Sequence, residues 1–352
     1  MANNTSLNKA KDTKKDEFYT RRVDIENELS HYADHFKDKV VYCNCDDPEW
    51  SEFWQFFRRN FRPWGLKKLI ATHYEPDEKN YAYKLEICED TNGDGVVDWK
   101  DDPVITQIPC NGDFRSAFCI DLLKEADIVV TNPPFSVIRE YIAQLMEYEK
   151  KFLIIAPLNA VKYRDTFALF MHNKIWMGYS HPKVFRVPEG TTGKSVYVED
   201  GVWYQKFGNV CWLTNLDIKK RHEFLDLRGT YYQPDIYQKF ANFDAVIINK
   251  ISDIPCDYDG IMGVPISFFD KYNPDQFILY GRTGDIDWAE SDECNFFTPP
   301  TIDEQNVFKK QNRTWRVQNG YYVTDDGIAH TVYDRLFVKL KNPEPRRFPD
   351  GD

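Results

Sequence analysis

The side chains best suited to catalysis in this chain lie between Asp127 and Ser136, a stretch that reads D-I-V-V-T-N-P-P-F-S. The apolar run Ile128–Val130 is typical of a buried parallel strand. That strand must end at Pro133 and Pro134, because proline donates no N–H and biases the residue before it away from the helical conformation. Open α/β sheets bind their ligands at the carboxyl ends of such strands, so this turn is expected to lie at a ligand site.

Three groups in the turn suit a planar base that carries an exocyclic amino group. The Asn132 side-chain oxygen and the Pro133 carbonyl can each accept one N–H of the amine, and Phe135 offers a ring for stacking. The alternative is a strand that ends in a Pro-Pro turn with a core phenylalanine. A helical stripe follows the turn, however, as the context of a site requires; its members are Ile138, Tyr141, Ile142 and Leu145.

In this context N-P-P-F resembles the catalytic motif of adenine-N6 and related amino methyltransferases. The resemblance implies that the catalytic residues are Asn132, Pro133, Pro134 and Phe135.

Composition limits the class of protein. A chain of 352 residues with 42% hydrophobic content can bury a sizeable core and is expected to form two lobes. The net charge of −11 argues against a protein that coats nucleic acid without specificity. Eight scattered cysteines indicate a reduced, cytoplasmic protein, and the absence of an apolar run of spanning length argues against a membrane partner.

The order of predicted elements indicates an α/β fold. Strands and helices alternate through residues 16–216, which predicts a parallel, doubly wound sheet in a catalytic domain with an insertion at 76–110. Residues 1–15 read as a flexible basic arm, and residues 217–352 read as a smaller, less regular α+β lobe. The strands expected in the catalytic domain are 40–42, 69–72, 128–130, 152–156, 175–177 and 210–214.

A helix is predicted to begin at Pro48 with Asp47 as its cap, since proline suits the first turn of a helix. Aromatic residues recur along it at helical spacing and are interpreted as core packing. They are Trp50, Phe53, Trp54 and Phe57.

A site for S-adenosylmethionine would be expected after the first strand, but no glycine-rich turn stands there. Asp46 and Asp47 could instead meet the ammonium group of the cofactor, and Asp113 with Phe114 could receive its adenine. Phe18 and its neighbours could enclose the methionine end, although a capping Asp or a core Phe is the alternative in each case. The candidate cofactor residues are Phe18, Tyr19, Thr20, Asn44, Cys45, Asp46, Asp47, Pro48, Asp113 and Phe114.

The insertion contains an acidic stretch from Asp90 to Asp101, which reads D-T-N-G-D-G-V-V-D-W-K-D. Its spacing matches a 12-residue calcium loop, including a glycine at the sixth position. The alternative is a solvated turn. The candidate ligands of a structural Ca²⁺ are Asp90, Asn92, Asp94, Val96, Asp98 and Asp101.

Seven segments together resemble the EcoRI-type adenine-specific DNA methyltransferases, and they follow one another along most of the chain. They are K-D-E-F-Y-T (Lys15–Thr20), D-K-V-V-Y-C-N-C-D-D-P (Asp38–Pro48), G-D-F-R-S (Gly112–Ser116), A-D-I-V-V-T-N-P-P-F-S (Ala126–Ser136), K-F-L-I-I (Lys151–Ile155), M-G-V-P-I (Met262–Ile266) and D-K-Y-N-P (Asp270–Pro274). The resemblance implies a Rossmann-like S-adenosylmethionine-dependent methyltransferase sheet, with target recognition towards the C-terminus.

It also implies methyl transfer to the N6 amine of a flipped-out adenine in a specific double-stranded DNA sequence. The enzyme would be the modification half of a restriction-modification system, with a restriction endonuclease acting separately on the same site, or an orphan or phage methylase. The alternatives are an amino methyltransferase acting on RNA or on a protein glutamine, and a calcium-dependent binding protein. Candidate phosphate contacts are Lys9, Lys11, Lys14, Lys15, Lys162, Arg164, Lys219, Lys220, Arg221, Arg313 and Arg316.

Overall fold

The computed structural model describes residues 18–45, 47–75, 81–231, 236–284, 296–311 and 319–345. These residues divide into two compact units. The first contains the chain up to Phe170 together with Lys174–Ile218, and the second contains Met171–Asn173 together with the residues from Lys219 onwards. Helices and strands mix in both units, which confirms a mixed α/β protein. No described helix combines the length and the apolar character that crossing a membrane requires.

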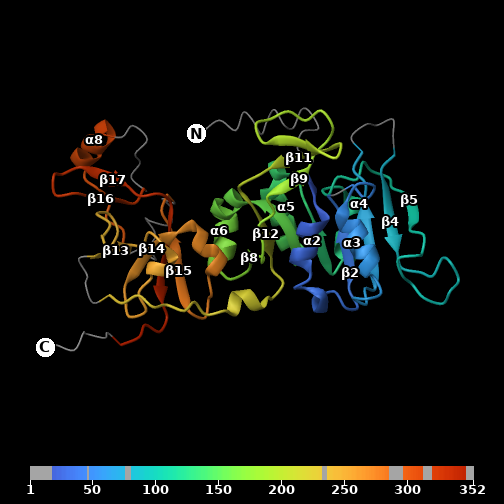
Figure 1. Ribbon diagram of the computed structural model, residues 1–352, viewed down its shortest axis with the longest axis horizontal. Helices are drawn as coiled ribbons and strands as arrows, with labels where there is room; N and C mark the ends of the chain where they lie inside the picture. Colours follow the sequence, from blue (N-terminus) through green and yellow to red (C-terminus); the bar gives the residue numbers. More distant parts are fainter. Residues whose placement is uncertain are drawn as a thin grey trace. The chain divides into compact units, whose positions relative to one another are not determined.

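The first unit is built around an eight-stranded sheet of order β5-β4-β3-β2-β6-β7-β12-β8 (Figure 1). Its strands are β2 (Val40–Cys43), β3 (Lys68–Thr72), β4 (Tyr83–Ile87), β5 (Val104–Gln107), β6 (Ile128–Thr131), β7 (Lys151–Pro157), β8 (Trp176–Met177) and β12 (Val210–Thr214). Its helices are α2 (Arg22–Leu29), α3 (Glu52–Asn60), α4 (Ala117–Glu125), α5 (Ile138–Glu147) and α6 (Arg164–Met171).

The prediction of an all-parallel sheet is right only for the four central strands. β3, β2, β6 and β7 are parallel neighbours, whereas β4 is antiparallel to β3 and β12 is antiparallel to β7. The connection from β3 to β4 is too short for the crossover that a parallel pair needs. β2 has β3 on one side and β6 on the other, so strand order reverses there, and the carboxyl ends of all four parallel strands meet at one edge.

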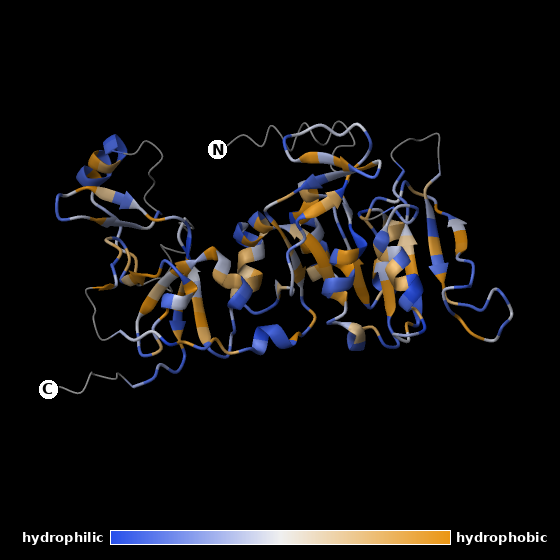
Figure 2. Cartoon of the chain, viewed as in Figure 1, coloured by the Kyte–Doolittle hydropathy of each residue, from blue (hydrophilic) through white to orange (hydrophobic). Residues whose placement is uncertain are grey.

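The core is apolar on both faces of this sheet. All residues of β2 and β6 are buried, and Figure 2 shows hydrophobic residues concentrated in the central strands. Ser51 caps α3 by accepting hydrogen bonds from the backbone N–H groups of Phe53 (3.1 Å) and Trp54 (3.4 Å). The helix therefore begins after Ser51, not at Pro48. Trp50 lies outside it and is 52% exposed, so its assignment to the core is wrong, whereas Phe53, Trp54 and Phe57 are buried as predicted.

A second sheet in the first unit was not predicted. It has four antiparallel strands in the order β1-β9-β11-β10, namely β1 (Tyr19–Thr20), β9 (Val184–Arg186), β11 (Val202–Lys206) and β10 (Val196–Glu199). Asp200 (φ 49°) and Gly201 (φ 77°) form the tight turn between β10 and β11. An Asp-Gly pair between β-branched and aromatic residues is a hairpin signal, and V-Y-V-E-D-G-V-W-Y carries it.

The second unit contains a four-stranded sheet of order β13-β14-β18-β15 and a separate hairpin of β16 and β17. The bounds are β13 (Ala245–Ile247), β14 (Ile261–Pro265), β15 (Phe277–Arg282), β16 (Tyr321–Val323), β17 (Ala329–Thr331) and β18 (Arg335–Leu340), with helix α8 at Ile302–Gln311. Its core includes Phe243, Phe296 and Phe337.

Candidate active site

Asn132 follows the last residue of β6 and is buried, with 7% of its surface exposed. Its Nδ2 donates a hydrogen bond to the carbonyl oxygen of Phe18, 114 residues earlier in the chain. This bond orients the amide, so that Oδ1 faces away from the Phe18 carbonyl. Within the described residues Oδ1 accepts no hydrogen bond, although it is buried. The carbonyl of the buried Pro133 accepts none there either, so two consecutive residues each offer an acceptor without a donor.

Phe18, whose carbonyl holds Asn132, joins a group of three aromatic rings that includes Phe135 of the turn. Phe135 begins a short 3-10 helix, Phe135–Val137, and is half-buried. Its ring centroid lies 6.0 Å from that of Phe18, which is 4.6 Å from Phe207. The N-terminal motif and the N-P-P-F turn, predicted separately as cofactor and catalytic residues, therefore lie together. Of the first motif, Thr20 is buried with an unpartnered Oγ1, whereas Tyr19 is half-exposed.

The end of β2 is bonded to the elements that carry the turn. The buried Asn44 accepts a hydrogen bond from the hydroxyl of Tyr141 on α5. The backbone N–H of Cys45 donates to Thr131 Oγ1 (3.1 Å), which links the end of β2 to the end of β6. Asp46, one of the two predicted ammonium partners, lies outside the described residues.

Asp47 belongs to a charged cluster that sequence reasoning missed. Its Oδ2 lies 3.1 Å from Nδ1 of His73, whose Nε2 is 3.7 Å from Glu75, and the His73 ring stacks on Tyr83 at 4.8 Å. The contact with Asp47 raises the pKa of His73, with Glu75 adding to it and burial opposing it. Burial alone would raise the pKa of Asp47, but bonds from His73 and the Glu49 N–H lower it overall. The sequence signal that could have revealed this cluster is that Asp47 and His73 each follow a predicted strand.

This pair should make stability depend on pH. The raised pKa of His73 means that its contribution is complete below the ordinary histidine value, near 6.5, and is lost as pH rises through the folded-state value. The melting temperature gap between the wild type and His73→Gln should therefore shrink as the pH rises from the ordinary histidine value through the raised folded-state pKa. His35→Gln, on a separate 3-10 helix of the same unit, is the control. A gap that stays constant over this range would contradict the ion pair.

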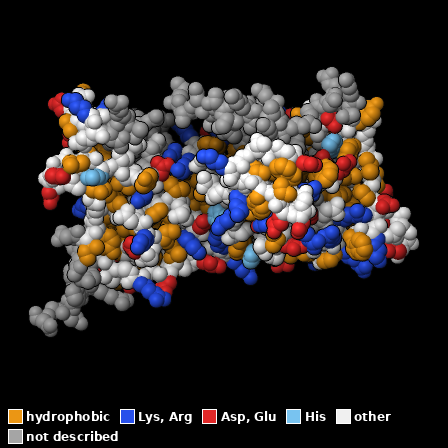
Figure 3. Space-filling model, turned by 45° about the horizontal axis from the view of Figure 1, so that its top comes forward, with side chains coloured by type: hydrophobic (Ala, Val, Ile, Leu, Met, Phe, Trp, Pro, Cys, Tyr) orange, Lys and Arg blue, Asp and Glu red, His pale blue; other side chains and the backbone are white. Residues whose placement is uncertain are grey.

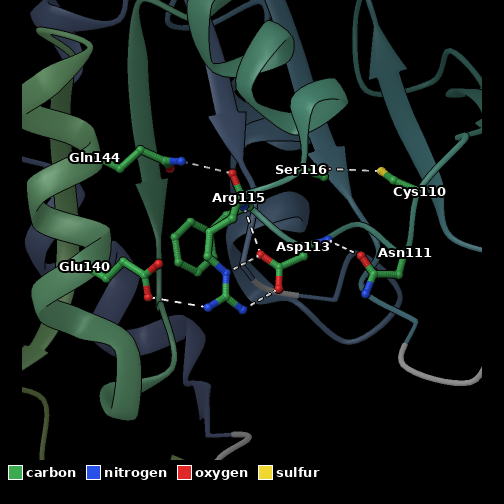
Figure 4. Close-up of polar contacts among 8 residues, drawn as sticks. Cys110, Asn111, Asp113, Arg115, Ser116, Glu140 and Gln144 are labelled. Atoms are coloured by element: carbon green, nitrogen blue, oxygen red, sulfur yellow. Dashed lines mark hydrogen bonds and ion pairs between the residues drawn. The ribbon is translucent and has the colours of Figure 1, made fainter.

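Asp113 is held in place by Arg115 (Figure 4). Oδ1 accepts from Arg115 Nε (2.8 Å) and Oδ2 accepts from Nη2 (2.6 Å), while Nη1 of the same arginine reaches Glu140 on α5 (3.4 Å). The hydrogen bonds from Arg115 keep the pKa of Asp113 below its ordinary value. Gly112 (φ 80°) has no room for a side chain, because a Cβ would lie 2.1 Å from the His73 carbonyl oxygen. The Asp113 loop thus lies against the end of β3.

Phe114, the other member of the predicted adenine pair, is buried and packs edge-on against Tyr141 at 5.1 Å. Its carbonyl accepts a hydrogen bond from Gln144 of α5 (3.2 Å). The ring therefore helps to join the loop to α5.

The structure does not support the expected calcium site in the acidic loop. Among the described residues, which include this whole loop, no group of three His, Cys, Asp or Glu side chains could hold a metal ion. The carboxylates turn towards backbone N–H groups instead: Asp90 accepts from Gly93 (2.6 Å) and Gly95 (2.7 Å), and Asp101 accepts from Thr91 (2.8 Å) and Asp98 (2.7 Å). The same hydrogen bonds lower the pKa of Asp101. The loop is thus closed by its own side chains.

The predicted phosphate contacts that the structure describes come from separate elements. Lys162 ends a 3-10 helix after β7, and Arg164 begins α6. Lys219, Lys220 and Arg221 form a 3-10 helix at the start of the second unit, where Lys220 lies 3.5 Å from Asp270. The remaining candidates, which are Lys9, Lys11, Lys14, Lys15, Arg313 and Arg316, lie outside the described residues.

Comparison with known proteins identifies relatives over most of the chain. The family model described as adenine-specific methyltransferase EcoRI matches residues 6–341. The type II methyltransferase M.EcoRI of Escherichia coli is 45% identical over 316 residues, which cover 84% of this chain and 95% of that protein.

Two mycoplasma proteins are also similar. The type II methyltransferase M.MpnI of Mycoplasma pneumoniae is 38% identical over 78% of this chain and 84% of its own length. M.MgeORF184P of Mycoplasma genitalium is 37% identical with the same coverage. No solved structure matches the chain. The family match spans both the N-P-P-F turn and Phe18, whose carbonyl orients the Asn132 amide of that turn. The chain therefore belongs to the EcoRI family of adenine-specific methyltransferases.

Proposed function

We propose that this enzyme transfers a methyl group to the N6 amine of an adenine that is flipped out of a specific sequence in double-stranded DNA. The observation that carries the proposal is the Asn132 amide, whose Nδ2 is held by the Phe18 carbonyl while Oδ1 is buried without a donor. A buried acceptor without a partner is costly, and an N–H of the substrate amine would satisfy it.

The mechanism follows from the electronic character of the substrate. The lone pair of an adenine amine is delocalised into the ring, which makes the nitrogen a poor nucleophile. Hydrogen bonds from its two protons to Asn132 Oδ1 and the Pro133 carbonyl favour the pyramidal nitrogen, whose lone pair is available. Phe135 would hold the base plane by stacking and so fix the direction of the nitrogen lone pair. These acceptors are preorganised because the amide is already fixed by Phe18.

The family implies S-adenosylmethionine, which supplies an electrophilic methyl group, as the cofactor. Residues after β2 and β3 and in the loop before α4 fit it, because the acceptors Asp47, Glu75 and Asp113 suit its ammonium, hydroxyl and amino groups. The unpartnered Oγ1 of the buried Thr20, two residues after the Phe18 that holds Asn132, adds an acceptor. The eight-stranded sheet would be its Rossmann-like framework, since the strand order reverses at β2.

We expect Asp113→Ala to weaken S-adenosylmethionine binding by about 10- to 100-fold, the value of a charge-assisted hydrogen bond. The reason is that Arg115 holds this carboxylate in one orientation, and isothermal titration measures the loss. Asp121→Ala is the matched control, because Asp121 pairs with Lys124 on the exposed face of α4. Normal binding of S-adenosylmethionine by Asp113→Ala would reject the assignment of Asp113 to the adenine of the cofactor.

Double-stranded DNA as the partner rests on the family and on the half-buried Phe135, which suits stacking on a flipped base. The second unit would recognise the target sequence. A restriction endonuclease acting separately on the same site would be the natural companion of such an enzyme, and an orphan methylase would lack one.

Sequencing modified adenines in DNA from cells that express the chain tests the function directly. We expect N6-methyladenine at one sequence motif, and none in cells that express Asn132→Ala. Methylated RNA or protein glutamine with unmodified DNA would refute the proposal in favour of another amino methyltransferase.

A further inference from the structure

One face of the β1-β9-β11-β10 sheet carries a continuous row of aromatic and basic side chains. Tyr19 pairs with Arg186, Arg186 pairs with Tyr204, and Tyr204 pairs with Tyr197. Directly opposed residues of antiparallel strands point to the same face, so these four side chains cross all four strands in line. Lys206 joins the row, because it lies two residues after Tyr204 on β11. We call these five residues the aromatic–basic row.

On β1 and β9 the opposite face of the same sheet packs into the core. Thr20 pairs with Phe185, and both are buried. The aromatic–basic row therefore faces away from the core, and its two cations are exposed while its three tyrosines are half-buried. Figure 3, in which the top of Figure 1 comes forward, shows hydrophobic and basic side chains next to one another in this region.

Both cations of the row are held by aromatic rings. The Arg186 guanidinium lies 5.2 Å from the centroid of Trp50, and Lys206 Nζ lies 5.2 Å from that of Tyr197. Tyr197 and Tyr204 are stacked at 5.6 Å. Cations held over rings keep their charge available to an anion, and exposed rings can stack on bases. The half-exposed position of Trp50 is thus explained by its contact with Arg186 and not by core packing.

The row begins beside the catalytic turn. Tyr19 directly follows Phe18, whose carbonyl holds Asn132. Four strands at a spacing of about 4.8 Å span about 14 Å, which corresponds to roughly four nucleotide steps of a B-form strand. The exposed Glu199 lies on the same face, two residues after Tyr197 on β10. Its carboxylate would repel phosphate, so the surface that can bind DNA ends before it.

We propose that the aromatic–basic row binds the DNA strand that carries the target adenine, next to the flipped base. Arg186 and Lys206 contact its phosphates, and Tyr197 and Tyr204 stack on bases that lose a neighbour when the adenine leaves the duplex. This inference rests on the proposed function and adds a DNA surface within the first unit. It also offers one way for a protein of net charge −11 to bind DNA, because two basic side chains lie where the strand would pass.

The test measures binding of a duplex containing the methylated motif to the full chain by fluorescence anisotropy at several salt concentrations. Lys206→Ala should reduce the slope of log K against log salt by about one, since one phosphate contact is lost. Tyr197→Ala should weaken binding by about tenfold, whereas Tyr197→Phe should bind normally because its ring remains. Lys124→Ala is the control, because this lysine is exposed at the end of α4 and precedes the amino end of β6.

Three readouts separate the possible outcomes. S-adenosylmethionine binding and melting temperature show that each variant is folded, and 2-aminopurine at the target position reports flipping, which Tyr197→Ala should reduce. Unchanged affinity and salt slope in the folded Lys206→Ala and Tyr197→Ala variants would show that the row does not bind DNA. The proposed function would stay intact. A wild type that methylates no DNA would instead overturn the function. Equal binding of an RNA duplex of the same sequence would contradict a surface built for the DNA strand.

Discussion

Asn132→Ala is expected to lower the rate of methyl transfer by about 10²- to 10³-fold, because it removes one acceptor that is used in the transition state. Cofactor binding should persist, since the Asn132 amide contacts the Phe18 backbone and its other atom, Oδ1, is the acceptor proposed for the substrate amine. Single-turnover transfer of a labelled methyl group to a target duplex, together with titration of S-adenosylmethionine, measures the two effects separately.

Two further variants sharpen this test. Asn132→Asp keeps an acceptor but places an oxygen opposite the Phe18 carbonyl, so its activity should fall between those of wild type and Asn132→Ala. Asn60→Ala is the matched control, because the Asn60 amide bonds the Phe56 carbonyl at the end of α3. Turnover near the wild-type rate in Asn132→Ala would reject the N-P-P-F turn as the catalytic centre.

Glu28→Ala is expected to destabilise the first unit by about 3–5 kcal/mol. Glu28 is fully buried on α2 and accepts four hydrogen bonds, from the Tyr32 hydroxyl, the Tyr179 N–H and both the N–H and the hydroxyl of Ser180. Its removal takes the acceptor from the buried Tyr32 hydroxyl and from three donors of the half-buried Tyr179 and Ser180, and a buried donor left without an acceptor costs about 1–3 kcal/mol. Urea denaturation followed by circular dichroism measures the change.

Glu26→Ala provides the comparison on the same helix. Glu26 pairs with Arg22 at the surface, where an ion pair contributes less than about 1 kcal/mol, so the stability should hardly change. Equal effects of the two substitutions would mean that the Glu28 hydrogen bonds do not hold α2 to the segment after β8. Because α2 begins one residue after β1, Glu28→Ala should also weaken the hold of Phe18 on Asn132.

Local sequence patterns were sufficient where neighbours in the chain define the structure. The apolar run before N-P-P-F forms β6, and the stripe after it forms α5, because residue spacing alone decides which face is buried. The family resemblance rested on similar short segments, and the comparisons confirm it. The start of α3 was misjudged by the same kind of reasoning, since Pro48 suits a first turn but Ser51 supplies the cap.

Tertiary structure decided everything that depends on contacts between distant residues. The bond that aims the Asn132 amide comes from Phe18, and no sequence pattern pairs residues 114 positions apart. The cluster of Asp47, His73 and Glu75 exists because β2 and β3 are adjacent parallel strands. The acidic loop kept the spacing of a calcium loop, yet its carboxylates bond backbone N–H groups, which spacing alone does not reveal.

The aromatic–basic row shows the physical reason for this division most clearly. Each of its residues is unremarkable in sequence, because an isolated tyrosine or lysine is found on most protein surfaces. Strand register brings Tyr19, Arg186, Tyr204 and Tyr197 onto one face, and register is a property of pairing between strands. Composition and motifs therefore identify the chemistry of this methyltransferase, whereas the orientation of the Asn132 amide and the surface that begins at Tyr19 arise only when the chain is folded.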